Sequence, residues 1–333
     1  MLSNKISLTG VKPTGTPHFG NLLGAFYPVV RMSDEAKKTY VFIADLHALN
    51  AVKDREFIHK NTYEIAATYL ALGINLEKAI LFRQSDIPEV YQLATLLMNV
   101  TPKGLMNRAH AYKASVDKNL AKGEDADAGI NMGLYTYPIL MAADILLYNS
   151  DVVPVGQDQK QHVEFARDIA GSFNYIYGKD LLTSPEPIIP EDAATVPGLD
   201  GRKMSKSYNN YIPIFAPEKE LRKLIMKIIT DSKLPEEPKD PEESTIFHLY
   251  RAFANEAQTE ELRQRFIKGG LGYGEAKQIL FEAINEKIAP AREKYYDLMA
   301  HTEQIDAILA DGAAKAREEA KKTLARVLKA MLG

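Results

Sequence analysis

The chain has 333 residues, with 41 Lys and Arg against 44 Asp and Glu, which gives a formal net charge of −3 at pH 7. This length allows one large or two medium-sized domains, and 46% hydrophobic with 26% charged residues is a globular composition that excludes a disordered chain or a generally basic nucleic-acid-binding surface. The complete absence of cysteine excludes a disulfide framework, thiolate metal centres and thiol catalysis, so a metal would have to rest on His and carboxylates or arrive with a substrate.

Neither a targeting segment nor a membrane span is predicted. The first ten residues lack the apolar core of a signal peptide. The longest apolar stretch, residues 129–143, is interrupted by Gly, Asn and Pro, so it is too short to cross a bilayer. We therefore expect a soluble, cytoplasmic protein with no membrane partner.

Strands and helices alternate over the first two-thirds of the chain. The pattern predicts strands over residues 5–8, 40–44, 79–82 and 152–155, and helices over residues 55–72, 90–100 and 137–148. Another helix is expected after the loop at residues 9–16, with Thr16 as its N-cap and Pro17 in its first position. This alternation predicts an α/β fold in which helices cover both faces of a parallel sheet.

The pattern becomes helical after about Ile214. An amphipathic helix is predicted over residues 217–230, a proline-rich acidic connector follows at residues 234–241, and helical periodicity resumes at Glu243, interrupted by glycines at 269, 270, 272, 274 and 312. We expect an α/β domain over residues 1–214, with inserted helices at about 85–130, and an all-helical domain over residues 215–333. The last helices are expected to pack back on the first domain.

The loop at residues 13–21 is the first candidate for chemistry. It connects a strand to a helix, so backbone N–H groups and a helix N-terminus converge there in an arrangement that favours phosphate. His18 and Asn21 face the same way in the first turn, and Gly20 leaves room for a flat ring against the backbone. An ordinary capped helix start is the alternative explanation.

The second candidate is the segment Gly201-Arg-Lys-Met-Ser-Lys-Ser207. Lys203 and Lys206 place two flexible ammonium groups on a loop rich in small residues, which suits a phosphate chain whose charge grows during a reaction. A solvated surface charge run is the usual explanation for a short basic stretch.

Together the two segments resemble the HIGH and KMSKS signatures of the class I aminoacyl-tRNA synthetases, spelled here His18-Phe-Gly-Asn21 and Lys203-Met-Ser-Lys-Ser207. Their order and their separation by an α/β domain also match. The resemblance implies a doubly wound, Rossmann-like (HUP-type) catalytic domain.

A third group lies on the helix predicted over residues 137–148. At 100° per residue, Tyr137, Met141, Asp144 and Tyr148 fall on one narrow face, so Asp144 is a single carboxylate on an apolar stripe. It either caps a backbone amide or accepts a hydrogen bond from an aromatic amino acid with one donor. A pocket in which Asp144 accepts such a hydrogen bond would bind phenylalanine less tightly, because the buried acceptor would lose its partner.

This helix and the string Val153-Pro-Val-Gly-Gln-Asp-Gln-Lys-Gln-His162 resemble the bacterial tryptophanyl-tRNA synthetases in particular. The resemblance implies that Asp144 accepts the indole N–H, that Met141 lines the ring pocket, and that Tyr137 and Gln159 hold the α-amino group. It also implies the following ATP contacts: Lys12, Pro13, Thr14, Gly20, Asn21, Gly156, Gln157, Asp158, Val196, Lys203, Met204, Ser205, Lys206 and Ser207. Arg108 and Lys113 match a basic pair near the triphosphate. Position 12 departs from the family, in which glutamine is common there.

The reaction that the resemblance implies has two steps. ATP, with Mg²⁺ on its phosphates and no protein-bound metal, activates L-tryptophan, which is then transferred to tRNA(Trp). Lys203, Lys206, His18 and Asn21 would be catalytic, the helical domain would bind the anticodon, and a homodimer is expected. The alternatives are a tyrosyl-tRNA synthetase, a small-molecule nucleotidyltransferase, and a synthetase-like tRNA-binding or regulatory protein.

Overall fold

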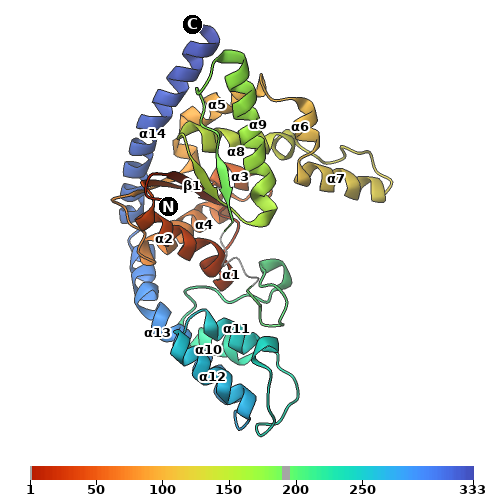
Figure 1. Ribbon diagram of the computed structural model, residues 1–333, viewed down its shortest axis with the longest axis vertical. Coiled ribbons are helices and arrows are strands. Elements are labelled where there is room, and N and C mark those ends of the chain that lie inside the picture. Colours follow the sequence, from red (N-terminus) through yellow and green to blue (C-terminus); the bar gives the residue numbers. More distant parts are fainter. Residues whose placement is uncertain (1, 190–195) are drawn as a thin grey trace.

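A five-stranded sheet forms the centre of the computed structural model, which describes residues 2–189 and 196–333 (Figure 1). All its strand pairs are parallel, and the strand order is β3-β2-β1-β4-β5. The strands are β1 (Ile6–Val11), β2 (Lys38–Ile43), β3 (Ala79–Arg83), β4 (Val152–Pro154) and β5 (Glu186–Ile188). The four predicted strands and the α/β fold class are confirmed, whereas the sequence did not predict the three-residue β5.

Helices cover both faces of the sheet, so the sheet is doubly wound. Along β2, Val41 and Ile43 point into one apolar cluster, while Tyr40 and Phe42 point into the other. The first cluster contains residues of α2 (Tyr27–Glu35) and α4 (Arg55–Ala71). The second contains residues of α5 (Pro88–Met98), α8 (Met132–Leu147) and α9 (Lys160–Tyr177). A strand buried on both faces needs apolar residues at successive positions, as β2 has.

The first helix starts later than predicted. Thr16 is not an N-cap and Pro17 is not helical; the helix α1 (Phe19–Asn21) follows extended backbone at His18 and runs through a π-helical turn at Leu22–Phe26 into α2. Tertiary pairing explains the difference, because the Pro17 carbonyl accepts a hydrogen bond from Ile214 N–H at 3.1 Å and His18 forms a β-bridge with Pro213. These contacts hold Pro17 and His18 extended.

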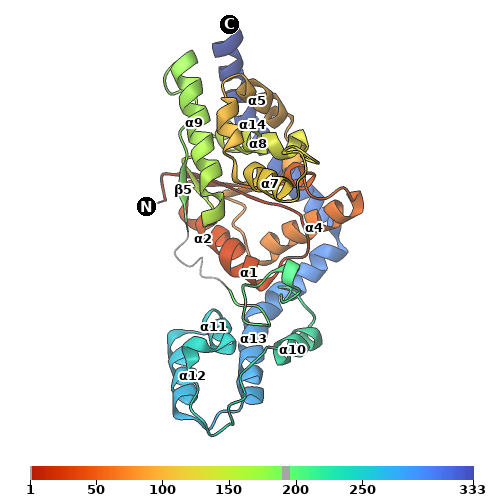
Figure 2. The ribbon, with the colours of Figure 1, turned by 90° about the vertical axis from the view of Figure 1, so that its right-hand side faces the viewer.

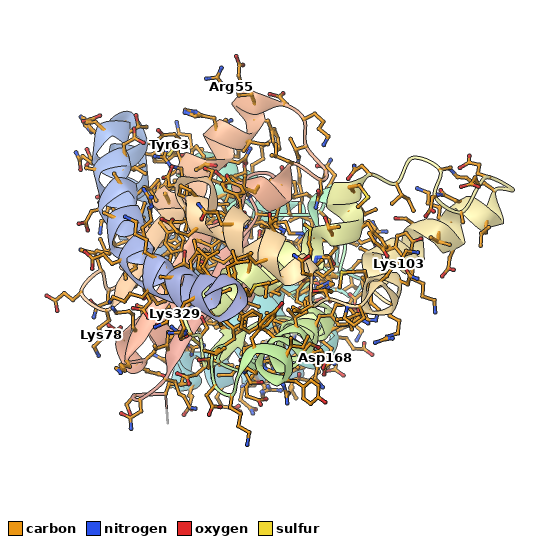
Figure 3. The ribbon with its side chains drawn as sticks, turned by 90° about the horizontal axis from the view of Figure 1, so that it is seen from above. Arg55, Tyr63, Lys78, Lys103, Asp168 and Lys329 are labelled. Atoms are coloured by element: carbon orange, nitrogen blue, oxygen red, sulfur yellow. The ribbon has the colours of Figure 1, made fainter. Side chains whose placement is uncertain are left out.

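Two short helices form an arm beside the sheet. The arm consists of α6 (Lys103–Asn107) and α7 (His110–Ala121), and it projects from the body in Figures 1 and 3, with Lys103 near its base. Gln161 of α9 anchors it, because its side chain accepts from His110 N–H at 3.1 Å and donates to the Arg108 carbonyl at 3.2 Å.

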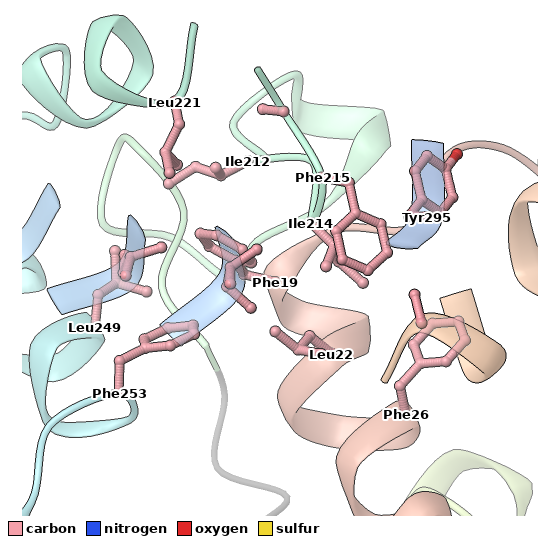
Figure 4. Packing of buried hydrophobic residues seen from close by; sticks show 14 of the residues in the cluster. Phe19, Leu22, Phe26, Ile212, Ile214, Phe215, Leu221, Leu249, Phe253 and Tyr295 are labelled. Carbon is pink, nitrogen blue, oxygen red and sulfur yellow. The ribbon is translucent and has the colours of Figure 1, made fainter. Parts of the chain in front are cut away.

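Beyond residue 214 the chain is helical, as predicted. The helices are α10 (Glu218–Met226), α11 (Thr245–Arg251), α12 (Glu256–Lys268), α13 (Tyr273–Ala300) and α14 (Thr302–Leu332). The apolar residues of α10 to α13 and of the start of α14 belong to the same cluster as the first face of the sheet, whereas those of the rest of α14 belong to the second cluster. Figure 4 shows the junction, where Phe19 of α1 lies among Ile212, Leu249 and Phe253, and the Phe19 and Phe253 ring centroids are 5.2 Å apart.

The long helix α14 returns along the sheet (Figure 2). Gly312 lies inside this helix and does not interrupt it. Glycine is needed at this position because a Cβ there would stand 1.9 Å from the Leu81 carbonyl oxygen of β3. Arg317 of α14 pairs with the buried Glu89 of α5 at 2.9 Å, and Asp306 accepts a hydrogen bond from Tyr63, which Figure 3 shows beside the same helix. Within the described ranges, no helix has the length and apolarity needed to cross a membrane.

Candidate active site

A cavity opens at the carboxyl ends of β1 and β4, where the strand order reverses direction. This is the place at which parallel α/β sheets bind ligands. Leu8, Thr9, Gly10, Lys12, Phe42, Ala44, His47, Tyr137, Met141, Asp144, Ile145, Val153, Pro154, Val155 and Gln159 line it. A side chain at Gly10 would reach within 2.4 Å of the Phe42 ring, so glycine is required for this ring to lie in the cavity wall.

Asp144 is the buried acid of the cavity. Its oxygens lie 2.8 and 2.9 Å from the side-chain nitrogen of Gln84, and Oδ2 lies 3.0 Å from His47 Nε2. Burial raises the pKa of Asp144, while the hydrogen bonds from His47 and Gln84 oppose this rise. Because a carboxylate offers about four acceptor positions, Asp144 retains capacity for one more donor from a ligand.

The other residues predicted to hold the amino acid also line this cavity. Tyr137 and Met141 stand one turn apart on α8, and Gln159 lies at the start of α9. The Tyr137 hydroxyl is hydrogen-bonded to His162 Nε2, and the two rings pack edge to face with centroids 4.9 Å apart. His162 thereby orients a residue of the cavity wall.

The side chains of His18 and Asn21 contact other residues of the first signature. Asn21 Oδ1 accepts a hydrogen bond from His18 N–H at 3.2 Å, and the His18 ring packs where a Cβ on Gly20 would be. Burial, reinforced by the charge of Lys206, lowers the pKa of His18 to about 4. The imidazole is therefore neutral at pH 7, and its buried Nδ1 has no hydrogen-bond partner among the described residues.

The second signature is held in shape by Asn210, which is buried at its end. Its side chain accepts from Ser205 N–H at 2.8 Å and donates to the Lys203 carbonyl at 3.2 Å and to Asp200 at 2.6 Å. The Val196 carbonyl accepts from Met204 N–H at 2.8 Å. These contacts fix the loop locally, although Lys203 and Ser207 are exposed.

The second signature contacts the loop at residues 13–21 at two points. The buried Met204 sulfur lies 3.3 Å from Gly20 N, and the Lys206 side chain covers Gly15, with Nζ 3.0 Å from the position of a Cβ on Gly15. Gly15 has φ +126°, in the left-handed region that favours glycine, so its backbone conformation requires glycine there. Lys203, by contrast, is exposed.

The remaining predicted ATP contacts lie in the first loop, after β4 and at the end of the second signature. Lys12 lines the cavity, and its carbonyl accepts from Thr14 N–H at 2.9 Å, while Pro13 is buried. Gly156 and Gln157 follow β4 and are exposed, as is Ser207. The side chain of Asp158 lies outside the described part of the structure. Arg108 and Lys113 are exposed on the α6–α7 arm, and neither lines the cavity.

Sequence reasoning missed three residues of this site: His47, Gln84 and His162. His47 and Gln84 each follow the end of a predicted buried strand, the same signal that drew attention to residues 13–21 and 156–162. His162 was part of a quoted string but had no role assigned to it. Among the residues that the structure describes, no cluster of three His, Asp or Glu side chains is suited to a metal ion.

Comparison with known proteins identifies the family of this chain. The family model "tRNA synthetases class I (W and Y)" matches residues 3–289. The chain is 51% identical to a tryptophan–tRNA ligase of Pseudomonas aeruginosa over 97% of this chain and 73% of that protein. It is also similar to the tryptophanyl-tRNA synthetase of Campylobacter jejuni solved with ADP and tryptophan, with TM-score 0.88, 43% identity and coverage of 97% and 98% of the two chains. For the Mycoplasma pneumoniae enzyme, the TM-score is 0.79 at 29% identity, with coverage of 99% of this chain and 98% of the other.

Proposed function

We infer that this chain, which belongs to the tryptophan and tyrosine branch of the class I tRNA synthetases, is a tryptophan–tRNA ligase. It activates L-tryptophan with ATP and transfers the aminoacyl group to tRNA(Trp). In the first step the tryptophan carboxylate attacks the α-phosphorus, a new P–O bond forms, and the bond to the β-phosphate oxygen breaks to release diphosphate. In the second step a hydroxyl of the terminal ribose of the tRNA takes the acyl group, and AMP leaves.

The buried carboxylate in the cavity is the observation that supports the choice of amino acid. We propose that Asp144 accepts the indole N–H, because His47 and Gln84 hold its oxygens while α8 surrounds it with apolar side chains. A phenylalanine ring would bury the same carboxylate without a donor, which costs about 1–3 kcal/mol or more. Met141 would contact the ring, and Tyr137 and Gln159 would bind the α-amino group.

The two signatures supply the phosphate chemistry in this proposal. Lys206 and Lys203 would stabilise the negative charge that develops on the leaving diphosphate. His18 is neutral, so it would contribute a hydrogen bond from its unpartnered Nδ1 and no charge. Asn21 and Gly20 would contact the nucleotide. No side chain acts as a nucleophile, so positioning and electrostatic stabilisation account for catalysis.

Mg²⁺ would arrive bound to the ATP phosphates as part of the substrate. The described residues offer no three-carboxylate or histidine cluster that competes for it. Arg108 and Lys113 lie on the α6–α7 arm and do not line the cavity, so they would contact the triphosphate only where it extends beyond the cavity.

We further propose that residues 1–214 form the catalytic domain and residues 215–333 the domain that binds the anticodon, with α14 packed back along the sheet. The protein would act as a cytoplasmic homodimer, which light scattering on the purified protein tests. A mass equal to one chain would contradict the dimer.

The decisive experiment is ATP–diphosphate exchange with each of the twenty amino acids in turn, followed by acylation of tRNA(Trp). Exchange should depend on tryptophan. Exchange with tyrosine would indicate the tyrosyl enzyme, and exchange without an amino acid would indicate a nucleotidyltransferase. No exchange at all would indicate a tRNA-binding or regulatory protein.

A further inference from the structure

A buried carboxylate beside the first signature has no role in the function proposed above. Glu64 belongs to α4 and is only 5% exposed. It lines a cavity together with Thr16 and Pro17, in the turn that leads to α1. Its Oε1 lies 3.7 Å from Nζ of the exposed Lys60, but its Oε2 is buried and has no hydrogen-bond partner in the described ranges. Such a group is costly to bury unless a cation compensates its charge.

Lys206 brings a cation to the same turn. Its ammonium group packs on Gly15, the residue before Thr16, and it forms no ion pair with any described residue. Burial lowers the pKa of Lys206, and the negative charge of Glu64 opposes this effect. The two residues are therefore electrostatically linked, although they are not in direct contact.

Among the described residues, few other ionisable groups face this pair. They are Lys60 from α4, His18 from the start of α1, Tyr295 and Tyr296 from α13, and Glu220 from α10. Lys60 is a cation, and His18 is neutral. In the part of the chain that the structure describes, Glu64 is the carboxylate that acts on Lys206.

We propose that Glu64 is a positioning residue for Lys206: its buried carboxylate keeps the ammonium group charged and seated on Gly15 before the triphosphate binds. This inference rests on the proposed function, in which Lys206 must be a cation to stabilise the leaving diphosphate. Without Glu64, a half-buried lysine beside a substrate-binding site would lose part of its positive charge. Glu64 acts through Lys206 and does not touch the substrate.

The test is the pH dependence of kcat/KM for ATP in tryptophan-dependent exchange, because this parameter reports the ionisation of the free enzyme. Glu64→Gln keeps the shape of the side chain and removes its charge. We expect the basic limb of the profile to move down by roughly one pH unit, the size of shift that a neighbouring charge causes. Activity at pH 7 should stay within about twofold, whereas at pH 9 it should fall about five- to tenfold for a limb displaced by that amount.

Two controls separate this role from a structural one. Glu220→Gln removes the other carboxylate of the same cavity and should leave the profile unchanged. In a Lys206→Ala background, Glu64→Gln should have no further effect on the profile, because the two residues act as a unit. Coincident profiles for Glu64→Gln and the wild type would overturn the proposal. If Glu64→Gln does not fold, Glu64→Leu removes the charge and refills the volume.

A second readout needs no catalysis. With limiting acetic anhydride, the neutral fraction of each lysine sets its labelling rate, which mass spectrometry measures. Lys206 should be labelled about five- to tenfold faster at pH 8 in Glu64→Gln than in the wild type, for a pKa lower by roughly one unit, and Lys203 should be unaffected. Equal labelling would refute the role of Glu64, whereas wild-type protein without tryptophan-dependent exchange would refute the proposed function instead.

Discussion

The clearest test of the amino-acid site is Asp144→Asn. Asp144 is 3% exposed, and its oxygens are already engaged by Gln84 and His47. An asparagine keeps a single acceptor oxygen and would turn its NH₂ group toward donors on these neighbours or on the ligand. The indole N–H would then lose a charge-assisted hydrogen bond in a buried site, which is worth about 1.5–3 kcal/mol. This corresponds to a Kd for tryptophan about 10- to 150-fold higher.

Tryptophan fluorescence measures this change without an indole signal from the protein itself. The sequence contains no tryptophan, so the bound substrate is the only indole in the complex. Asp45→Asn is the matched control, since Asp45 lies at the same end of the sheet but accepts its hydrogen bonds from Ser85 and Leu46 and does not line the cavity. Its Kd should stay within about twofold of the wild type. An unchanged Kd for Asp144→Asn would refute the role of this carboxylate in binding the indole.

Three further predictions address catalysis, packing and pH. Lys206→Ala should lower the rate of adenylate formation about 10²- to 10³-fold and leave the Kd for tryptophan nearly unchanged; stopped-flow measurements check this, and a normal rate would exclude the role of Lys206. Gly312→Ala should destabilise the protein by about 2 kcal/mol or more in urea unfolding, because the new methyl group would overlap the Leu81 carbonyl, whereas Gly171→Ala, with open space around it, should be neutral or stabilising by up to about 1 kcal/mol; similar losses for both would contradict the close approach. The pKa of His18 is lowered to about 4 in the folded state, so below about pH 6.5 the unfolded chain binds more protons than the folded one. The stability that the neutral imidazole contributes is therefore full above that pH and is lost as the pH falls toward 4, by about 2 kcal/mol. Thermal melts of His18→Gln should show less loss of stability between pH 7 and pH 5 than the wild type, and parallel losses would argue against a lowered pKa of His18.

The sequence pattern was sufficient to predict those features of the structure that depend on local periodicity. The narrow face of Tyr137, Met141 and Asp144 follows from helical geometry alone, and all three residues line the cavity. The buried strands were equally visible, because residues covered on both faces form uninterrupted apolar runs. The three residues of β5 were too few to give such a run.

The features that the sequence did not predict depend on contacts between residues far apart in the sequence. Thr16 and Pro17 have the ideal chemistry for a helix start, yet pairing of Pro17 and His18 with residues near 213 overrides that preference. His47 and Gln84 reach Asp144 only because β1, β2 and β3 end at the same edge of the sheet. Likewise, nothing near Lys206 in the sequence indicates that its side chain rests on Gly15.

The packing of α14 on β3 has a consequence for the folding of the chain during its synthesis. β3 is an edge strand, and an uncovered edge offers unpaired backbone groups to any other extended chain, which promotes aggregation. Here the cover comes from a helix about 230 residues further along the sequence, so it can form only late in synthesis. A nascent or truncated chain ending before Thr302 would hold a formed sheet with an open edge. Such chains should depend on chaperones during translation and should precipitate when expressed alone, even though they contain every residue of the proposed catalytic site.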